Sequence, residues 1–403
     1  MLPGCADAPE GKEDAMHNIK VIIGASYGDE GKGLATDFFG SREKRKEELI
    51  NVLTNGGPQR GHTVELADGR RHVFRHFGAA SFRGAASYFA PQFLVNPMEF
   101  VREYDELARI HRPPEAYMQP GCRITTPWDM LVNQRLREMR GLHNSCGFGI
   151  WETVLRYQRG SGIPVSVFAA MSREDRTGYL RRLRDGYFMN RLRELGAGAP
   201  EFFCADDLLF HFEEDFETMY RLCPMRTEEY LKSYRTVLFE NAQGLLLDGN
   251  LKGQEETTTP STTGIAGVFG TVENVFRGAD VEVCYVTRSY LTRHGDGIME
   301  SEMNAEEVQR FLPGVRADMT NRENRHQGAL RFGVADAGRI TDRIREDFTF
   351  CCGDTKNTYR PTVMVTHLNE YAGIDTDLFA GGFGRVYLSD GRTSGDVCAR
   401  TGQ

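Results

Sequence analysis

The stretch that decides the fold reads Val21-Ile22-Ile23-Gly24-Ala25-Ser26-Tyr27-Gly28-Asp29-Glu30-Gly31-Lys32-Gly33. A short β-branched apolar run ends in glycine, a glycine-rich turn delivers one lysine, and the residues that follow permit a helix. Strand, loop and helix in this order form the context in which backbone N–H groups surround phosphates. Lys32 adds a fixed positive charge, so the stretch predicts an anion-binding loop in an α/β fold.

The loop differs from the ordinary phosphate-binding loop. That motif places four residues between its first glycine and Gly-Lys, and a Ser or Thr after the lysine binds magnesium. Here six residues separate Gly24 from Gly31, Gly33 follows the lysine, and the carboxylate of Asp29 lies inside the loop. A carboxylate that faces phosphates must bind a metal, take a proton or be repelled. The alternative is a glycine-rich turn between strand and helix that carries a surface lysine.

Composition limits the partners of the chain. Its 403 residues can bury a large core, and a net charge of -8 argues against binding duplex nucleic acid. No segment reaches the roughly 18 apolar residues of a membrane span. Residues 1–18 are polar, lack the features of a signal peptide and are predicted to be a disordered extension. Nine scattered cysteines without a CxxC pair predict reduced thiols and a cytoplasmic location.

A second glycine-rich loop follows the strand predicted at 50–54, and it ends in Gly61-His62-Thr63. His62 is a side chain that can donate a proton near neutral pH. Taken alone, a loop histidine is more often structural or solvated. Paired with Asp29, it becomes an acid/base candidate, because two titratable groups in phosphate-binding loops suit a kinase-like activation.

Strand and helix patterns alternate along the chain, with polar loops at the strand ends. We therefore predict an α/β fold with a mostly parallel central sheet flanked by helices, and a site at the carboxyl ends of its strands. A charged, helix-patterned segment at about 172–233 predicts a helical insertion, within a single domain that covers 19–403. A tight turn is expected at 241–244, and the last strand at 385–388.

With these loops in hand, the chain resembles the adenylosuccinate synthetase family. The family's Gly-Asp-Glu-Gly-Lys-Gly loop is Gly28 to Gly33, and its Asn-Ala-Gly-His-Thr loop is matched by 59–63. Its Phe-Glu-Gly-Ala-Gln-Gly turn appears at 239–244, and its Ala-Tyr-(Ser/Thr)-Thr-Arg motif at 289–293. A looser match lies at Thr366-His367-Leu368-Asn369. The resemblance covers nearly everything after residue 18 and implies a fold similar to that of the phosphate-loop NTPases.

The resemblance implies a ligase that joins L-aspartate to the 6-oxo position of a purine nucleoside monophosphate, driven by a nucleoside triphosphate and Mg²⁺. Asp29 would remove the N1 proton and bind the metal together with the Gly61 carbonyl. His62 would act as an acid while the γ-phosphoryl group moves to O6, and Lys32 would complete the catalytic set. A homodimer also follows from the resemblance.

The remaining site residues are implied in the same way. Those expected to bind the triphosphate are Gly28, Glu30, Gly31, Lys32, Gly33, Gly61, His62, Thr63, Asn369, Ser389 and Gly391. Those expected to bind the purine monophosphate are Asp29, Gln59, Ser145, Cys146, Arg156, Gln243, Leu247 and Thr258. Those expected to bind aspartate are Thr320, Arg322 and Arg325.

The informative departure is Asn369, which stands where the common family has an aspartate that accepts hydrogen bonds from guanine N1 and N2. Asparagine offers one carbonyl and one amide, so it cannot accept at both points, and ATP or GTP are both possible donors. Other stretches, at 77–82, 93–97 and 324–333, are similar to archaeal and bacteriophage forms. One phage branch uses dGMP as acceptor for diaminopurine DNA. We favour dGMP narrowly; IMP is the alternative, and Asp29 is the residue of the IMP enzymes.

Two further alternatives stay open. The chain can be a nucleotide-binding regulator that has lost turnover, although intact Asp29, Lys32 and His62 speak against it. It can also be a related ligase that acts on another oxo-heterocycle.

Overall fold

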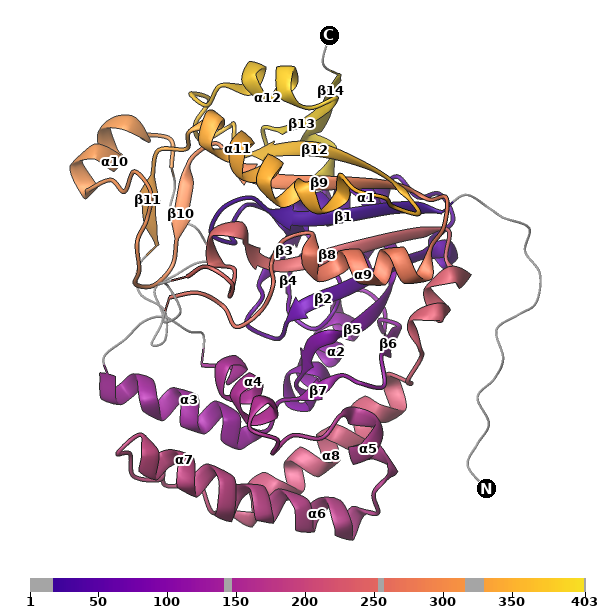
Figure 1. Cartoon of the computed structure of the whole chain (residues 1–403), viewed down its shortest axis with the longest axis vertical. Coiled ribbons are helices and arrows are strands. Elements are labelled where there is room, and N and C mark those ends of the chain that lie inside the picture. Colours follow the sequence, from indigo (N-terminus) through magenta and orange to yellow (C-terminus); the bar gives the residue numbers. More distant parts are fainter. Residues whose placement is uncertain (1–16, 141–146, 253–256, 316–329, 402–403) are drawn as a thin grey trace.

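A computed structural model describes residues 17–140, 147–252, 257–315 and 330–401. Its centre is a ten-stranded sheet in the order β14-β13-β12-β9-β1-β8-β2-β5-β6, with β7 paired to β5. Every neighbouring pair in this sheet is parallel except β13 and β14. The predicted mostly parallel α/β fold is confirmed (Figure 1).

The strands of the large sheet are β1 (Asn18–Gly24), β2 (Leu49–Gly56), β5 (Ala86–Val95), β6 (Ala116–Met118), β7 (Arg123–Ile124), β8 (Thr236–Gly244), β9 (Asp280–Arg288), β12 (Thr358–Thr366), β13 (Arg385–Ser389) and β14 (Val397–Thr401). Two small antiparallel pairs are added: β3 (His62–Glu65) with β4 (Arg71–Phe74), and β10 (Leu291–Arg293) with β11 (Arg331–Gly333).

Helices cover both faces of the sheet, and the alternation of side chains along β1 shows how. Val21 and Ile23 point into a core shared with α9 (Ala266–Val275) and α11 (Ala337–Phe348). Ile22 points to the opposite face, where it joins a core with α1 (Lys32–Ser41). Because both faces are covered, the central strands read as continuous apolar runs in place of an alternating pattern.

A helical lobe lies beyond the β6–β7 edge of the sheet, at the opposite end from β14 (Figure 1). It contains α3 (Pro127–Arg140), α4 (Ile150–Gln158), α5 (Val165–Ala170), α6 (Arg173–Arg182), η3 (Leu183–Phe188), α7 (Met189–Glu194) and α8 (Asp206–Leu222). α2 (Pro97–Ile110) packs against α8. Trp128 and Phe212 share one apolar core, so the lobe begins well before the segment 172–233 that charge density marked.

The remaining helices are short. They are α10 (Ala305–Phe311), α12 (Thr376–Gly382) and the short helices η1 (Lys46–Glu48), η2 (Ala79–Arg83), η4 (Glu228–Ser233), η5 (Leu245–Leu247), η6 (Thr349–Cys351) and η7 (Ser394–Asp396). Across the parts of the chain that the structure describes, no helix is both long and apolar enough to cross a bilayer.

Two expectations about the strands were wrong. β14 follows the strand that was expected to be the last, and its mostly exposed side chains give no apolar pattern by which to find it. The expected turn at 241–244 is instead the end of β8, which continues to Gly244 with Gln243 at a φ of 65°. The predicted disordered extension at 1–18 lies outside the described residues except for its last two.

Candidate active site

A pocket opens at the carboxyl ends of the parallel strands, where the sequence predicted it. Loops that follow β1, β2, β9, β12 and β13 converge there. The predicted residues among its lining are Gly28, Asp29, Gly31, Lys32, Gly33, Gly61, His62, Thr63, Asn369 and Gly391. Residues that are far apart in the sequence are thus brought together because the segments that carry them follow neighbouring strands of the sheet.

The first loop is folded around the carboxylate of Glu30. Its Oε1 accepts from the backbone N–H groups of Ser26 at 3.0 Å and Gly28 at 2.6 Å. The Lys32 ammonium donates to Glu30 Oε2 at 3.0 Å and to the Gly28 carbonyl at 2.6 Å. Glu30 is buried and does not line the pocket. The structure therefore gives Glu30 the position of a group that shapes the loop, beneath the residues expected to bind phosphate.

Two glycines allow this arrangement. Gly28 has a φ of 105°, a conformation that side chains rarely adopt. A Cβ at Gly33 would lie 2.6 Å from the Thr63 carbonyl oxygen, so α1 can approach the second loop this closely only without a side chain. This approach places Lys32 and His62 in the same pocket.

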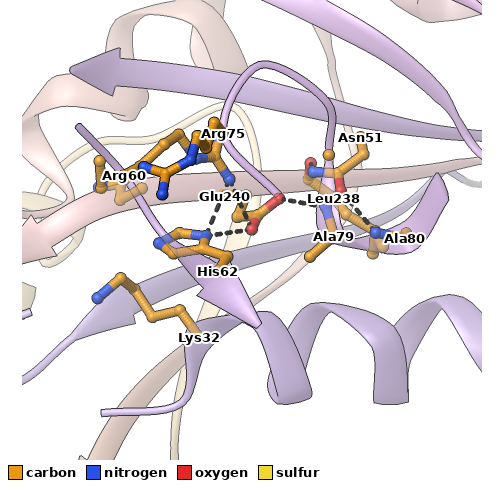
Figure 2. A network of polar contacts seen from close by, with 12 residues as sticks. Lys32, Asn51, Arg60, His62, Arg75, Ala79, Ala80, Leu238 and Glu240 are labelled. Atoms are coloured by element: carbon orange, nitrogen blue, oxygen red, sulfur yellow. Dashed lines mark hydrogen bonds and ion pairs between the residues drawn. The ribbon is translucent and has the colours of Figure 1, made fainter. Parts of the chain in front are cut away.

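His62 belongs to a buried network with Glu240 and Arg60 (Figure 2). Its Nδ1 makes a short contact with Glu240 Oε1, and Arg60 Nη2 lies 2.7 Å from the same oxygen. An ionised carboxylate only accepts, so the contact with Glu240 places the proton on Nδ1 and the lone pair on Nε2; Arg60 Nη2, 2.9 Å from Nδ1, then donates to the carboxylate and not to the ring. The second carboxylate oxygen accepts from the backbone N–H of Ala79 at 3.1 Å. Glu240 therefore fixes both the orientation and the tautomer of His62.

The same network sets the protonation states. Burial and the neighbouring Arg60 charge lower the pKa of His62 to about 4, although Glu240 acts to raise it. Burial raises the pKa of Glu240, but Arg60 and His62 outweigh it and lower the value to about 2. In the protein alone, His62 is thus neutral at pH 7. This differs from the predicted titration near neutrality, since the sequence showed neither the burial nor the arginine contact.

Asp29 projects from the first loop with about a quarter of its side chain exposed. The Arg288 guanidinium donates to its backbone carbonyl. His294 Nε2 lies 3.6 Å from Asp29 Oδ2. Within the described ranges, no three His, Cys, Asp or Glu side chains converge to hold a cation. The Asp29 carboxylate and the Gly61 residue both face the pocket, and such oxygens fit Mg²⁺ when substrate phosphates supply the other ligands.

The pocket is also lined by Asn369, Gly391 and Arg392. Ser389 is fully buried and donates to the Gly391 carbonyl at 3.1 Å. It therefore holds the loop after β13 and does not line the pocket, although the sequence predicted it as a nucleotide ligand.

Of the described residues expected to bind the purine monophosphate, Asp29 lines the pocket and the others do not. Gln243 lies against Gly28, and Gln59 lies against Gly56. Leu247 packs on the apolar core, and Thr258 is partly exposed. The Arg156 guanidinium is buried and paired with Asp129 at 2.9 Å in the helical lobe, and it does not line the pocket; its expected contact with the purine monophosphate stays a prediction. Five further residues with expected roles lie outside the described part of the chain: Ser145, Cys146, Thr320, Arg322 and Arg325.

Sequence reasoning assigned no role to Glu240, Arg60, Arg288 or His294, which surround the predicted catalytic residues. One signal was available. Glu240 is a carboxylate directly after the apolar run 237–239 of β8, and such a residue is rarely buried without a specific partner. The position of His294 depends on tertiary contacts that no local pattern reveals.

Comparisons with known proteins agree with the fold. The ligated adenylosuccinate synthetase of Plasmodium falciparum superposes with a TM-score of 0.67 at 16% identity, over 96% of this chain and 88% of that one. The succinoaminodeoxyadenylate synthetase of cyanophage S-2L, bound to dGMP and dATP, superposes with a TM-score of 0.60 at 14% identity, over 95% of each chain. At these identities the likeness shows the fold alone.

Sequence comparison finds curated relatives. The adenylosuccinate synthetase of Acaryochloris marina is 25% identical over 304 residues, which are 72% of this chain and 64% of that protein. The Clostridium perfringens enzyme is 24% identical over 88% of this chain and 78% of its own length. The chain thus spans slightly less than two thirds of the Acaryochloris marina protein. The family model described as adenylosuccinate synthetase matches residues 21–345. Since that match covers most of the chain, this protein belongs to the adenylosuccinate synthetase family.

Proposed function

We propose that this protein is a carbon–nitrogen ligase that joins L-aspartate to C6 of a purine nucleoside monophosphate and uses a nucleoside triphosphate. The observation that carries the proposal is that Asp29, Lys32 and His62 line one pocket although they come from two separate loops. A base, a phosphate-binding cation and an oriented imidazole are the groups that phosphorylation of a purine oxygen needs.

In the first step, the Asp29 carboxylate takes the proton from purine N1. Electron density moves to O6, which attacks the γ-phosphorus, and the nucleoside diphosphate leaves with the electrons of the broken P–O bond. Lys32 stabilises charge on the triphosphate. The approaching phosphoryl group brings negative charge to His62 Nε2, which favours a protonated imidazole that can donate to that group.

In the second step, the aspartate amine attacks C6 and inorganic phosphate leaves with O6. As the C–N bond forms, the amine nitrogen gives one proton to the departing phosphate and keeps the other, and Asp29 releases the proton taken from N1 to solvent. Phosphorylation is needed because an oxide is a poor leaving group from C6, whereas phosphate is a good one. Thr320, Arg322 and Arg325 are proposed to bind the aspartate carboxylates, and Ser145 and Cys146 the acceptor phosphate.

Mg²⁺ is proposed as the cofactor, with the Asp29 carboxylate and the Gly61 carbonyl as its protein ligands. Bound there, it would neutralise charge on the triphosphate. These two oxygens and the substrate phosphates make a hard donor set of the kind that Mg²⁺ prefers.

We propose ATP as the donor and dGMP as the acceptor, with IMP as the alternative. Asn369 lines the pocket at the position where the common family has a guanine-reading aspartate, which supports a donor other than GTP. An enzyme whose acceptor is a guanine nucleotide gains from a donor site that does not require guanine. The cyanophage protein of the same fold was solved with dGMP and dATP. A homodimer in the cytoplasm is part of the same proposal.

The test is a matrix of phosphate-release assays with Mg²⁺ and L-aspartate. The acceptors dGMP, GMP, IMP and dIMP are each combined with ATP and with GTP. The proposal expects release that requires both aspartate and dGMP, with ATP preferred. Turnover of IMP alone would remove the dGMP assignment. No release with any acceptor would overturn the ligase and favour a regulator that binds nucleotides without turnover.

A further inference from the structure

His294 is a histidine beside Asp29 to which the proposed reaction assigns no role. It follows β10 directly, and its Nε2 lies 3.6 Å from Asp29 Oδ2. The side chain is 14% exposed, and neither ring nitrogen has a hydrogen-bond partner among the described residues. A distance of 3.6 Å is slightly longer than a hydrogen bond, so a small movement of either side chain brings the two atoms into bonding range.

The position of His294 is fixed by its neighbour. The buried Arg293 side chain donates to the carbonyl groups of Thr257, at 3.0 Å, and Ile298. Its guanidinium also lies over the ring of Tyr27, 5.0 Å from the centroid. Tyr27 stands two residues before Asp29 in the first loop. Arg293 therefore ties the end of β10 to the loop that carries Asp29, and this holds the imidazole opposite the carboxylate.

The other charged groups near Asp29 contact different atoms. Arg288 donates to the Asp29 backbone carbonyl, and Lys32 donates to Glu30 and Gly28. In the part of the chain that the structure describes, His294 is the one basic side chain within 4.0 Å of the Asp29 carboxylate. A hydrogen bond from His294 can therefore set the orientation of the Asp29 carboxylate.

We propose that His294 is a positioning residue for Asp29, an inference that rests on the proposed function. Its Nε2–H holds Oδ2 of the carboxylate and turns the other oxygen, Oδ1, toward N1–H of the acceptor purine. Proton transfer depends steeply on such alignment, because a misplacement of about 1 Å can reduce a rate on the order of 100-fold. The imidazole itself does not touch the reacting atoms.

Replacement by two different amides provides the test. In His294→Gln, the amide nitrogen can occupy the place of Nε2, whereas in His294→Asn it occupies the place of Nδ1 and does not reach Asp29. We expect His294→Asn and His294→Ala to lower kcat about 10- to 100-fold, with the KM for the triphosphate changed less than about threefold. His294→Gln should recover most of the loss. His211→Gln, at an exposed histidine of α8, is the matched control and should leave kcat unchanged.

Equal kcat values for the Gln and Asn variants, or an effect on KM alone, would overturn the proposal. Crystal structures of the wild type and His294→Asn give a readout that does not depend on turnover. The proposal expects one Asp29 rotamer with Oδ2 within hydrogen-bond distance of Nε2 in the wild type, and altered or multiple rotamers in the variant. An unchanged Asp29 rotamer would refute the positioning role. Failure of the wild type to release phosphate would refute the proposed function separately.

Discussion

The Glu30 carboxylate lies 3.0 Å from the Lys32 ammonium, and both side chains are buried. A buried charge is costly unless it is paired and hydrogen-bonded. Glu30 meets this condition through Lys32 and the two backbone N–H groups of Ser26 and Gly28. The loop therefore holds its lysine ready for phosphate through an internal carboxylate and does not depend on a ligand for its shape.

Replacing Glu30 with glutamine should loosen this loop. The change removes the negative charge that pairs with Lys32, so the buried ammonium keeps only neutral partners, the Gly28 carbonyl and the new amide. We expect the free energy of unfolding to fall by about 1–3 kcal/mol and triphosphate affinity to fall as well, measured by urea denaturation and calorimetry. Glu106→Gln, at a half-exposed glutamate of α2, should change stability by less than about 0.5 kcal/mol. Equal stability of the two variants would contradict the role of Glu30.

Replacing Asp29 with asparagine should remove the base and keep the shape of the loop. Asparagine has nearly the same size but cannot accept the N1 proton. We expect kcat for phosphate release to fall at least about 100-fold, while triphosphate binding remains measurable by calorimetry. A variant with wild-type kcat would show that another group takes the proton.

Replacing Asn369 with aspartate should shift donor choice toward GTP. The carboxylate would offer two acceptors to guanine N1–H and N2–H, and it would disfavour adenine, whose N1 is an acceptor. We expect the ratio of kcat/KM for GTP to that for ATP to rise at least about tenfold. Asn190→Asp in α7 is a control that should leave the ratio unchanged. An unchanged ratio in N369D would place the donor base elsewhere.

His76 should make stability depend on pH. The ring is fully buried, Nε2 accepts from the backbone N–H of Asn96 at 2.9 Å, and Phe89, Phe93 and Phe100 surround it. Burial and nearby arginines lower its pKa to about 3, well below the value of about 6.5 in an unfolded chain. The unfolded state therefore binds one more proton between these two values. The stability that depends on neutral His76 is complete above about pH 6.5 and is lost as pH falls toward 3.

The expected slope from this group is about 1.4 kcal/mol of unfolding free energy per pH unit between pH 6 and 4. His76→Gln keeps an acceptor for the Asn96 N–H and removes the proton site. The pH slope of the unfolding free energy of this variant, measured with urea, should therefore be smaller than the wild-type slope by about 1.4 kcal/mol per pH unit. His211→Gln, at an exposed histidine, should retain the wild-type slope. The same slope in all three proteins would show that His76 is not the responsible group.

Much of the site could be predicted from local sequence because its residues lie just after strands. The glycine-rich loop at 28–33 and His62 were found in this way, and Asn369 through the family resemblance; Gly28, Lys32, His62 and Asn369 all line the pocket. Glu30 lies in the first loop and Ser389 ends β13, but both side chains are buried, and motif position does not give that direction. Arg156 shows the limit most clearly. Its partner Asp129 comes from another helix, so only the folded chain reveals that the guanidinium is paired and buried.

The central claim is that O6 of the purine is phosphorylated before aspartate displaces it, and an isotope experiment tests it directly. The enzyme is incubated with dGMP labelled with ¹⁸O at O6, ATP, Mg²⁺ and L-aspartate, and the released phosphate is analysed by mass spectrometry. The account predicts that each phosphate released carries one ¹⁸O atom, and that the succinylated nucleotide carries none at C6. Unlabelled phosphate, with the label retained in the nucleotide or lost to water, would contradict it.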